Sequence, residues 1–118
     1  MAKPTFYHYP NCSTCKKARK WLDARGLEVT AIDLVATPPS AAVLARVLER
    51  SGLELRKLFN VSGQSYREGG WKDRLATIDR AAALAALAAD GKLIKRPILL
   101  GDDFALVGFD ADAWSEVV

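Results

Sequence analysis

Two cysteines, Cys12 and Cys15, lie between a strand-like segment and a cationic helical segment, and this placement constrains the fold more than any other feature. Residues 5–9 are aromatic and β-favouring, which predicts a first strand. After the cysteines, apolar residues recur every three or four positions until Gly26 ends the helical pattern. Residues 29–34 favour a second strand. The first third of the chain therefore predicts a β-α-β unit with parallel strands.

The middle of the chain is helical, and its end returns to strands. Residues 62–70 are polar and glycine-containing, so we expect a loop there with at most one turn of helix. The helices expected in this part of the chain cover residues 40–52, 54–59 and 79–90. Beyond them we expect a hairpin of strands 94–100 and 104–107, and a last helix that Asp110 caps.

This order of elements predicts one α/β domain over residues 1–118: a thioredoxin-like four-stranded mixed β-sheet, built from βαβ and ββα halves, with a helical insertion over about residues 40–92. A length of 118 residues, half of them hydrophobic, fits a single globular unit. No apolar run approaches the roughly 20 residues that a membrane span needs. With no signal-peptide pattern, a cytoplasmic location and no membrane association are expected.

Cys12 stands at the start of the first helix, where the backbone N–H groups lack partners within the helix. These donors and the helix dipole stabilise an anion, and residues 16–25 contain five basic residues but only one acidic residue. Both effects predict a lowered pKa for the Cys12 thiol. Cys15 lies within the first helical turn, close enough to attack a mixed disulfide on Cys12.

Two other interpretations of the cysteine pair stay open. In the first, the cysteines are inert small hydrophobic residues. In the second, they form half of a zinc site, which needs two further ligands. His8 is the only histidine and there is no third cysteine, so we expect no metal held by this chain alone. His8 fits a strand residue with a satisfied ring better than a catalytic base.

Polar residues flank Cys12 and are candidate substrate-binding residues. The amides and hydroxyls of Ser13 and Thr14 suit an anion-binding loop around the sulfur, and they equally suit an ordinary helix start. Asn11 precedes Cys12 and is included in the same candidate site.

Pro97 interrupts an apolar strand, where a proline is unfavourable unless its geometry is used. In a thioredoxin-like sheet, a proline that enters the third strand is usually cis and faces the cysteine loop. Arg96 would then reach the same cleft, where its guanidinium can hold an oxyanion or a carboxylate through two hydrogen bonds. The alternative is a solvated basic residue at a strand start.

Three segments together resemble the family that contains arsenate reductases (ArsC), Spx and YffB-like proteins: residues 7–22 (YHYPNCSTCKKARKWL), 93–100 (LIKRPILL) and 106–109 (LVGF). The resemblance covers essentially the whole chain, including the helical insertion. It implies that Cys12 is the reactive thiol and that Arg96 and a cis Pro97 lie at the cleft. The last segment and the Cys-x-x-Cys pair are more similar to the small ArsC-like proteins than to well-defined arsenate reductases.

The arsenate reductases that this chain resembles use three arginines around the nucleophilic cysteine, and Arg96 matches only one of those positions. Asn60 occupies the second position, which makes it a candidate substrate-binding residue. The third position falls in residues 105–108, which contain no arginine. Losing a charge-assisted contact costs about 1.5–3 kcal/mol, so the resemblance implies weakened arsenate binding. The nearby basic residues that could compensate are Arg56, Lys57 and Arg67.

Two functions follow from these residues and the resemblance. The first is a thiol–disulfide oxidoreductase in which Cys12 attacks a disulfide, a glutathione mixed disulfide or an oxidised oxyanion, and Cys15 resolves the intermediate. It needs no bound cofactor, because glutathione, glutaredoxin or thioredoxin would supply electrons. The second is an Spx-like redox-sensing regulator that binds RNA polymerase. The net charge of +3 is modest and no helix-turn-helix pattern is present, so direct nucleic-acid binding is not expected.

Overall fold

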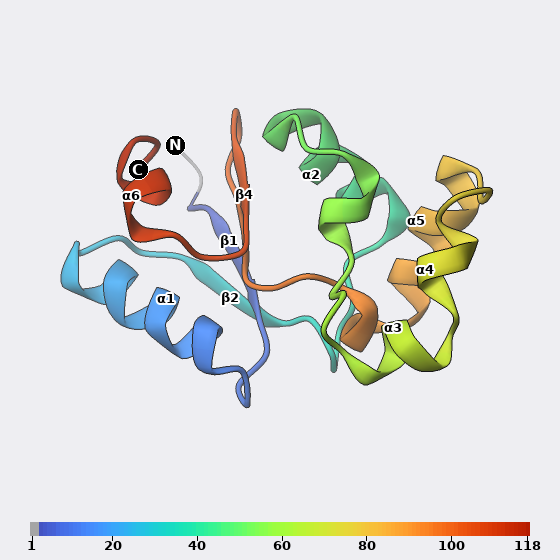
Figure 1. The fold of residues 1–118 in the computed structure, drawn as a ribbon. Coiled ribbons are helices and arrows are strands. Elements are labelled where there is room, and N and C mark those ends of the chain that lie inside the picture. The colour runs from blue at the N-terminus through green and yellow to red at the C-terminus, as the bar shows by residue number, and fades with distance from the viewer. Residues whose placement is uncertain (1–2) are drawn as a thin grey trace.

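Four short strands form one mixed sheet at the centre of the computed structural model, which describes residues 3–118 (Figure 1). β1 (Thr5–His8) lies between β2 (Thr30–Asp33) and β3 (Ile98–Leu100), and β4 (Ala105–Val107) completes the order β2-β1-β3-β4. β1 and β2 are parallel, and the other neighbouring pairs are antiparallel. This topology confirms the predicted fold class, a thioredoxin-like mixed sheet made of βαβ and ββα halves.

α1 (Ser13–Ala24) connects the two parallel strands and begins at the cysteine pair. Ala18 and Leu22 lie four residues apart on its buried face, and both are fully buried. Gly26 follows the helix at a φ of 69°, in the left-handed region that glycine adopts at little cost. The helix and its glycine end are therefore as predicted.

Along the chain, the predicted helical insertion separates β1 and β2 from β3 and β4. α2 (Ala41–Ser51) begins at Ser40, whose hydroxyl accepts a hydrogen bond from the Val43 amide at 3.2 Å. The remaining elements of the insertion are η1 (Leu55–Leu58), α3 (Gln64–Glu68), α4 (Trp71–Arg74), α5 (Arg80–Ala89) and η2 (Gly91–Leu93). α6 (Ala111–Ser115) follows β4 and is capped by Asp110, as expected. No helix within residues 3–118 has the length and apolar character needed to cross a membrane.

Two segments differ from the prediction. Within residues 62–70, where a loop with at most one turn of helix was expected, α3 is five residues long and so slightly exceeds one turn, and α4 follows almost directly. The strand expected from residue 94 begins only at Ile98, because Pro97 has no N–H to donate to a neighbouring strand. Ile94 instead forms an isolated antiparallel bridge with Phe59, which joins the insertion to the segment before β3.

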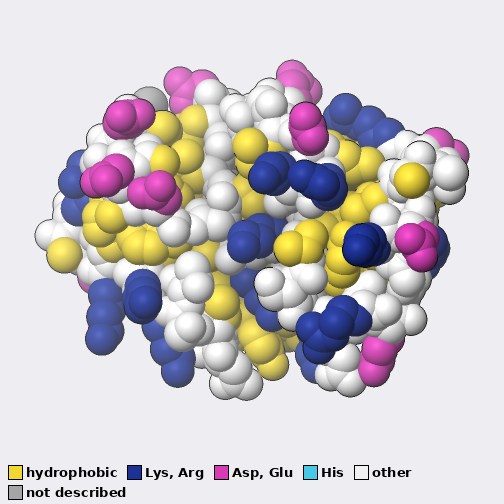
Figure 2. Space-filling view, in the orientation of Figure 1, with side chains coloured by type: hydrophobic (Ala, Val, Ile, Leu, Met, Phe, Trp, Pro, Cys, Tyr) yellow, Lys and Arg dark blue, Asp and Glu magenta, His cyan; other side chains and the backbone are white. Residues whose placement is uncertain are grey.

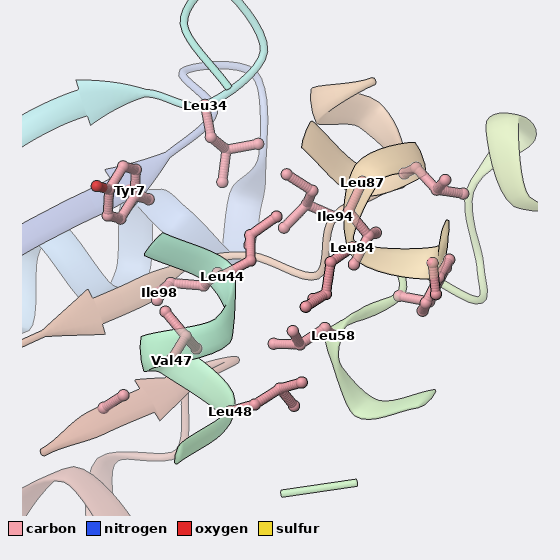
Figure 3. Close-up of a cluster of buried hydrophobic side chains, with 14 of the residues drawn as sticks. Tyr7, Leu34, Leu44, Val47, Leu48, Leu58, Leu84, Leu87, Ile94 and Ile98 are labelled. Atoms are coloured by element: carbon pink, nitrogen blue, oxygen red, sulfur yellow. The ribbon is translucent and has the colours of Figure 1, made fainter. Parts of the chain in front are cut away.

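β1 is covered on both faces of the sheet: successive side chains of a strand point to opposite faces, and its two central residues, Phe6 and Tyr7, are both buried. Phe6 packs against α1 and α6, whereas Tyr7 belongs to a cluster shared with the helical insertion. Figure 3 shows this second cluster, in which Leu44 of α2 and Leu87 of α5 lie with Ile98 of β3; all three are fully buried. The insertion thus packs directly on the sheet.

Candidate active site

Cys12 lies where β1 leads into α1, and it is the N-cap residue of the helix. Its amide donates a hydrogen bond to the Tyr9 carbonyl at 2.9 Å. The Cys15 amide donates to Cys12 Sγ at 3.4 Å, so one of the free donors at the helix start is directed at the sulfur. Cys12 is half-buried, which leaves it partly open to solvent.

Arg96 reaches the same place from the other half of the chain. It precedes Pro97, and the peptide bond between them is cis, as expected. Its Nη1 donates to the carbonyls of Lys92 at 3.3 Å and Ile94 at 3.5 Å, and its guanidinium carbon lies 5.1 Å from the centroid of the Tyr9 ring. These contacts hold the guanidinium beside the cysteine loop.

The environment of Cys12 favours its thiolate. Partial burial raises the pKa of this thiol, but hydrogen bonding from Cys15 and the N–H groups and charge of Arg96 outweigh burial. The pKa of Cys12 therefore lies below that of an ordinary cysteine. The thiolate is the nucleophilic form of a cysteine side chain, and this environment favours it at Cys12.

Cys15 has the opposite environment. It is buried, with 2% of its surface exposed, and its Sγ accepts a hydrogen bond from the Tyr9 amide at 3.5 Å. Burial is the largest effect and raises the pKa of Cys15 to about 12. The hydrogen bond from the Tyr9 amide, the next largest effect, lowers this pKa; the hydrogen bond and charge of Cys12 raise it, and the charge of Arg96 lowers it. The pair thus combines a thiol poised to ionise with one that stays protonated.

A pocket of about 470 Å³ opens beside Arg96. Tyr9 and Lys92 line it together with Arg96, and Asn60 and residues of α3 complete it. The structure therefore brings Asn60 and Arg96, both singled out from the sequence, to one cavity next to the cysteine loop. The backbone N–H of Asn60 donates to the Leu93 carbonyl at 2.8 Å, which joins the segment after η1 to the end of η2.

The other six residues that line this pocket were not singled out from the sequence: Tyr9, Gly63, Gln64, Ser65, Glu68 and Lys92. Gln64 donates to a carboxylate oxygen of Glu68 at 2.7 Å, so a negative charge lies in the same cavity as the Arg96 guanidinium. The α3 residues belong to no motif. Tyr9 could have been identified from its position three residues before Cys12, because a residue between β1 and the cysteine loop is well placed to line a pocket beside that loop.

Ser13 and Thr14 are the first two residues of α1. Within the described chain, no hydrogen bond joins either side chain to Cys12, and it is the Cys15 amide that reaches the sulfur. Their positions agree with a helix start. A role for them in binding a substrate anion stays a prediction.

Asn11 and Pro97, the other predicted substrate-binding residues, flank the site from its two halves. Asn11 is exposed, and its Nδ2 donates to the Tyr9 hydroxyl at 3.4 Å. Pro97 is buried, and its carbonyl accepts a hydrogen bond from the Gly108 amide at 2.8 Å, which ties the segment before β3 to the chain after β4.

The basic residues considered as replacements for the missing arginines lie elsewhere. Arg56 and Lys57 line a different pocket, and the Arg67 side chain donates to the Ser62 carbonyl at 2.8 Å. Among the residues that line the pocket beside Arg96, the cations are Lys92 and Arg96 itself. This pocket therefore has one guanidinium and one ammonium with which to attract an anion.

His8 and Cys15 line a separate pocket. Neither Asn60 nor Arg96 lines that pocket. Its ring stacks on Phe6, with centroids 5.3 Å apart. Burial and then Arg19 lower the pKa of His8, although Asp33 acts in the opposite direction, so the neutral ring is favoured. Within residues 3–118, no three His, Cys, Asp or Glu side chains lie close enough together to hold a metal ion.

Comparison with known proteins places the chain in a family. The model of the ArsC family matches residues 7–117. The chain is 45% identical to YusI, an uncharacterized protein of Bacillus subtilis (strain 168), over 95% of both chains. It is 26% identical to the regulatory protein MgsR of the same organism, over 90% of this chain and 82% of MgsR. The structure of arsenate reductase from Vibrio cholerae is 28% identical and covers 98% of both chains with a TM-score of 0.88. This chain therefore belongs to the ArsC family.

Proposed function

We propose that the protein is a thiol–disulfide oxidoreductase in which Cys12 is the nucleophile and Cys15 is the resolving thiol. The observation that carries this proposal is the contrast between the two sulfurs: the pKa of Cys12 is lowered with the help of Arg96, and burial raises the pKa of Cys15 to about 12. A purely structural cysteine pair has no need for such a contrast or for a guanidinium beside one sulfur.

In the first step, the Cys12 thiolate attacks one sulfur of a substrate disulfide. A bond forms between Cys12 Sγ and that sulfur, the substrate S–S bond breaks, and the second substrate sulfur leaves as a thiolate. Arg96 stabilises the Cys12 thiolate before the attack and can then hold an anionic group of the bound substrate.

Cys15 resolves the mixed disulfide. The charge on Cys12, which helps to keep Cys15 protonated, disappears once Cys12 is in a disulfide, whereas the Tyr9 amide and Arg96 still favour a Cys15 thiolate. Cys15 then loses its proton, attacks Cys12 Sγ and expels the substrate thiolate, which leaves a Cys12–Cys15 disulfide. Two electrons and two protons from glutathione, glutaredoxin or thioredoxin restore both thiols, which suits a reducing compartment such as the cytoplasm.

The charges of the pocket support a disulfide rather than arsenate as the substrate. Lys92 and Arg96 attract an anion, but Glu68 lies in the same pocket and repels one that carries several negative charges. A glutathione mixed disulfide offers carboxylates to the cations and amides to Asn60 and Gln64. The proposed substrate class is therefore a small peptide-like disulfide.

The test compares wild type with Cys12→Ser and Cys15→Ser in a glutathione-coupled assay of hydroxyethyl disulfide reduction, run beside an arsenate reduction assay. Wild type should reduce the disulfide, Cys12→Ser should lose this activity, and Cys15→Ser should accumulate a mixed disulfide on Cys12 that mass spectrometry detects. Full activity in Cys12→Ser would refute the mechanism. Faster turnover of arsenate than of the disulfide would overturn the substrate class alone.

The relative named as the regulatory protein MgsR supports a second candidate, a redox-sensing regulator. In that case the Cys12–Cys15 disulfide is a switch that changes binding to RNA polymerase, not an intermediate of turnover. Capture of purified RNA polymerase by the oxidised protein, but not by the reduced protein or by Cys12→Ser, would favour the regulator over the enzyme.

A further inference from the structure

A second pocket, of about 570 Å³, lies apart from the cysteines. Four basic residues surround it: Arg56 and Lys57 from η1, Lys72 from α4 and Lys95 from the segment before β3. We propose that this cationic pocket binds an organic phosphate, a ligand that carries several negative charges on an apolar or aromatic body.

The four cations are not neutralised by the protein. Within residues 3–118, none of their side chains forms a salt bridge or a hydrogen bond, and no carboxylate lines the cationic pocket. The neighbouring hollow contains Asp73, which makes no ion pair with Lys72. Four like charges around one concavity repel one another, so the pocket is best suited to a ligand with more than one negative charge.

The floor of the cationic pocket is apolar. It contains Phe59 and Tyr66, whose rings pack edge to face with centroids 6.4 Å apart, and Val61, which is 51% exposed. Figure 2 shows hydrophobic side chains lying among several Lys and Arg side chains on this face of the molecule. An inorganic anion would leave these apolar atoms in water, whereas an apolar or aromatic group on the ligand would cover them.

The cationic pocket is distinct from the one beside Cys12, although the same paired segments form both. Phe59 and Lys95 line the cationic pocket, while the residues that follow them, Asn60 and Arg96, line the pocket beside the cysteines. The Lys95 amide donates to the Leu58 carbonyl at 2.7 Å, which joins the two segments. Successive side chains therefore face different cavities, and a ligand in one does not occupy the other.

The test is calorimetric titration of the whole protein with ATP at constant ionic strength in the presence of EDTA, with inorganic triphosphate and adenosine as comparison ligands. ATP should bind most tightly, because only ATP offers both charge and an aromatic body. Lys57→Glu and Lys72→Glu should each weaken ATP binding about tenfold or more. Lys17→Glu, an equal charge change on an exposed residue of α1, should have little effect.

Two further measurements locate the ligand. Amide NMR shifts on adding ATP should concentrate around Val61 and Tyr66, and Cys12→Ser should bind ATP as wild type does, which separates this site from the proposed redox activity. Inorganic triphosphate binding as tightly as ATP would overturn the assignment of an organic ligand. Shifts confined to Tyr9 and Arg96, or equal losses in all three Glu variants, would overturn the site itself.

Discussion

The guanidinium of Arg96 lies over the ring of Tyr9, with its central carbon 5.1 Å from the ring centroid. The backbone of Tyr9 forms hydrogen bonds with both cysteines. The Tyr9 carbonyl accepts from the Cys12 amide, and its amide donates to Cys15 Sγ. Tyr9 therefore contacts the backbone of Cys12, the sulfur of Cys15 and the guanidinium that favours the Cys12 thiolate. Because its ring also lines the pocket beside Arg96, Tyr9 is a positioning residue for the proposed reaction.

Replacing Tyr9 by leucine should raise the pKa of the Cys12 thiol. The backbone bonds to the cysteines remain in Tyr9→Leu, but the ring that supports the Arg96 guanidinium is lost. Tyr9→Phe keeps the ring and should behave nearly as wild type. The measurement is the rate of iodoacetamide alkylation of Cys12 as a function of pH; a Tyr9→Leu profile that coincides with wild type would contradict this role.

Removing the guanidinium itself should have a larger effect in the same direction. Arg96→Gln eliminates both the charge and the N–H groups that lower the pKa of Cys12, so its thiolate should form only at higher pH. Arg96→Lys keeps the charge and should fall between Arg96→Gln and wild type. Arg67→Gln, which changes an arginine outside the pocket, is the control for the loss of one positive charge. The alkylation profile again distinguishes them, and equal profiles for the two Gln variants would refute the assignment.

Cys15 should make the reduced protein less stable in alkaline solution. The pKa of Cys15 is about 12 in the folded protein, whereas the pKa of a cysteine thiol in the unfolded chain is about 8.5. Between these pH values the unfolded chain loses the proton first, so the free energy of unfolding should fall as pH rises above about 9. Cys15→Ala should show a shallower fall in urea unfolding with reductant present. If the two curves have the same slope, the buried thiol does not carry this effect.

The insertion should contribute to the stability of the whole domain through its shared cluster with the sheet. Leu44 of α2 is fully buried in that cluster, so Leu44→Ala should lower the free energy of unfolding by about 2–5 kcal/mol. Leu53→Ala, at a position 38% exposed, should cost less than about 1 kcal/mol. Urea unfolding of both variants measures the difference, and a single transition in each tests whether insertion and sheet unfold together.

Sequence patterns correctly predicted the features that depend on residues close together along the chain. Gly26 at the end of α1, the cap at Asp110 and the position of Cys12 at a helix start all depend on local backbone chemistry. The strand expected from residue 94 was too long, because hydrophobicity alone does not show how the missing N–H of Pro97 affects pairing.

The walls of the pocket could be predicted only in part. Asn60 was found through a family resemblance, whereas Gln64 and Glu68 lie on a short helix without a recognisable pattern. Their approach to Arg96 depends on the bridge between Phe59 and Ile94, two residues far apart in the sequence. Such long-range pairing has no signature in a single sequence.

The two buried clusters support different parts of the molecule. Phe6 and its neighbours anchor the helix on which the thiols depend, while the cluster around Tyr7 holds the insertion that supplies the opposite wall of the pocket. Substitutions in α3 would therefore alter one wall of the pocket, while the helix that begins at the cysteines stays packed on its own cluster. The cysteine-bearing helix and the pocket wall opposite it can therefore tolerate substitutions largely independently of each other, because each is packed around a different set of buried side chains.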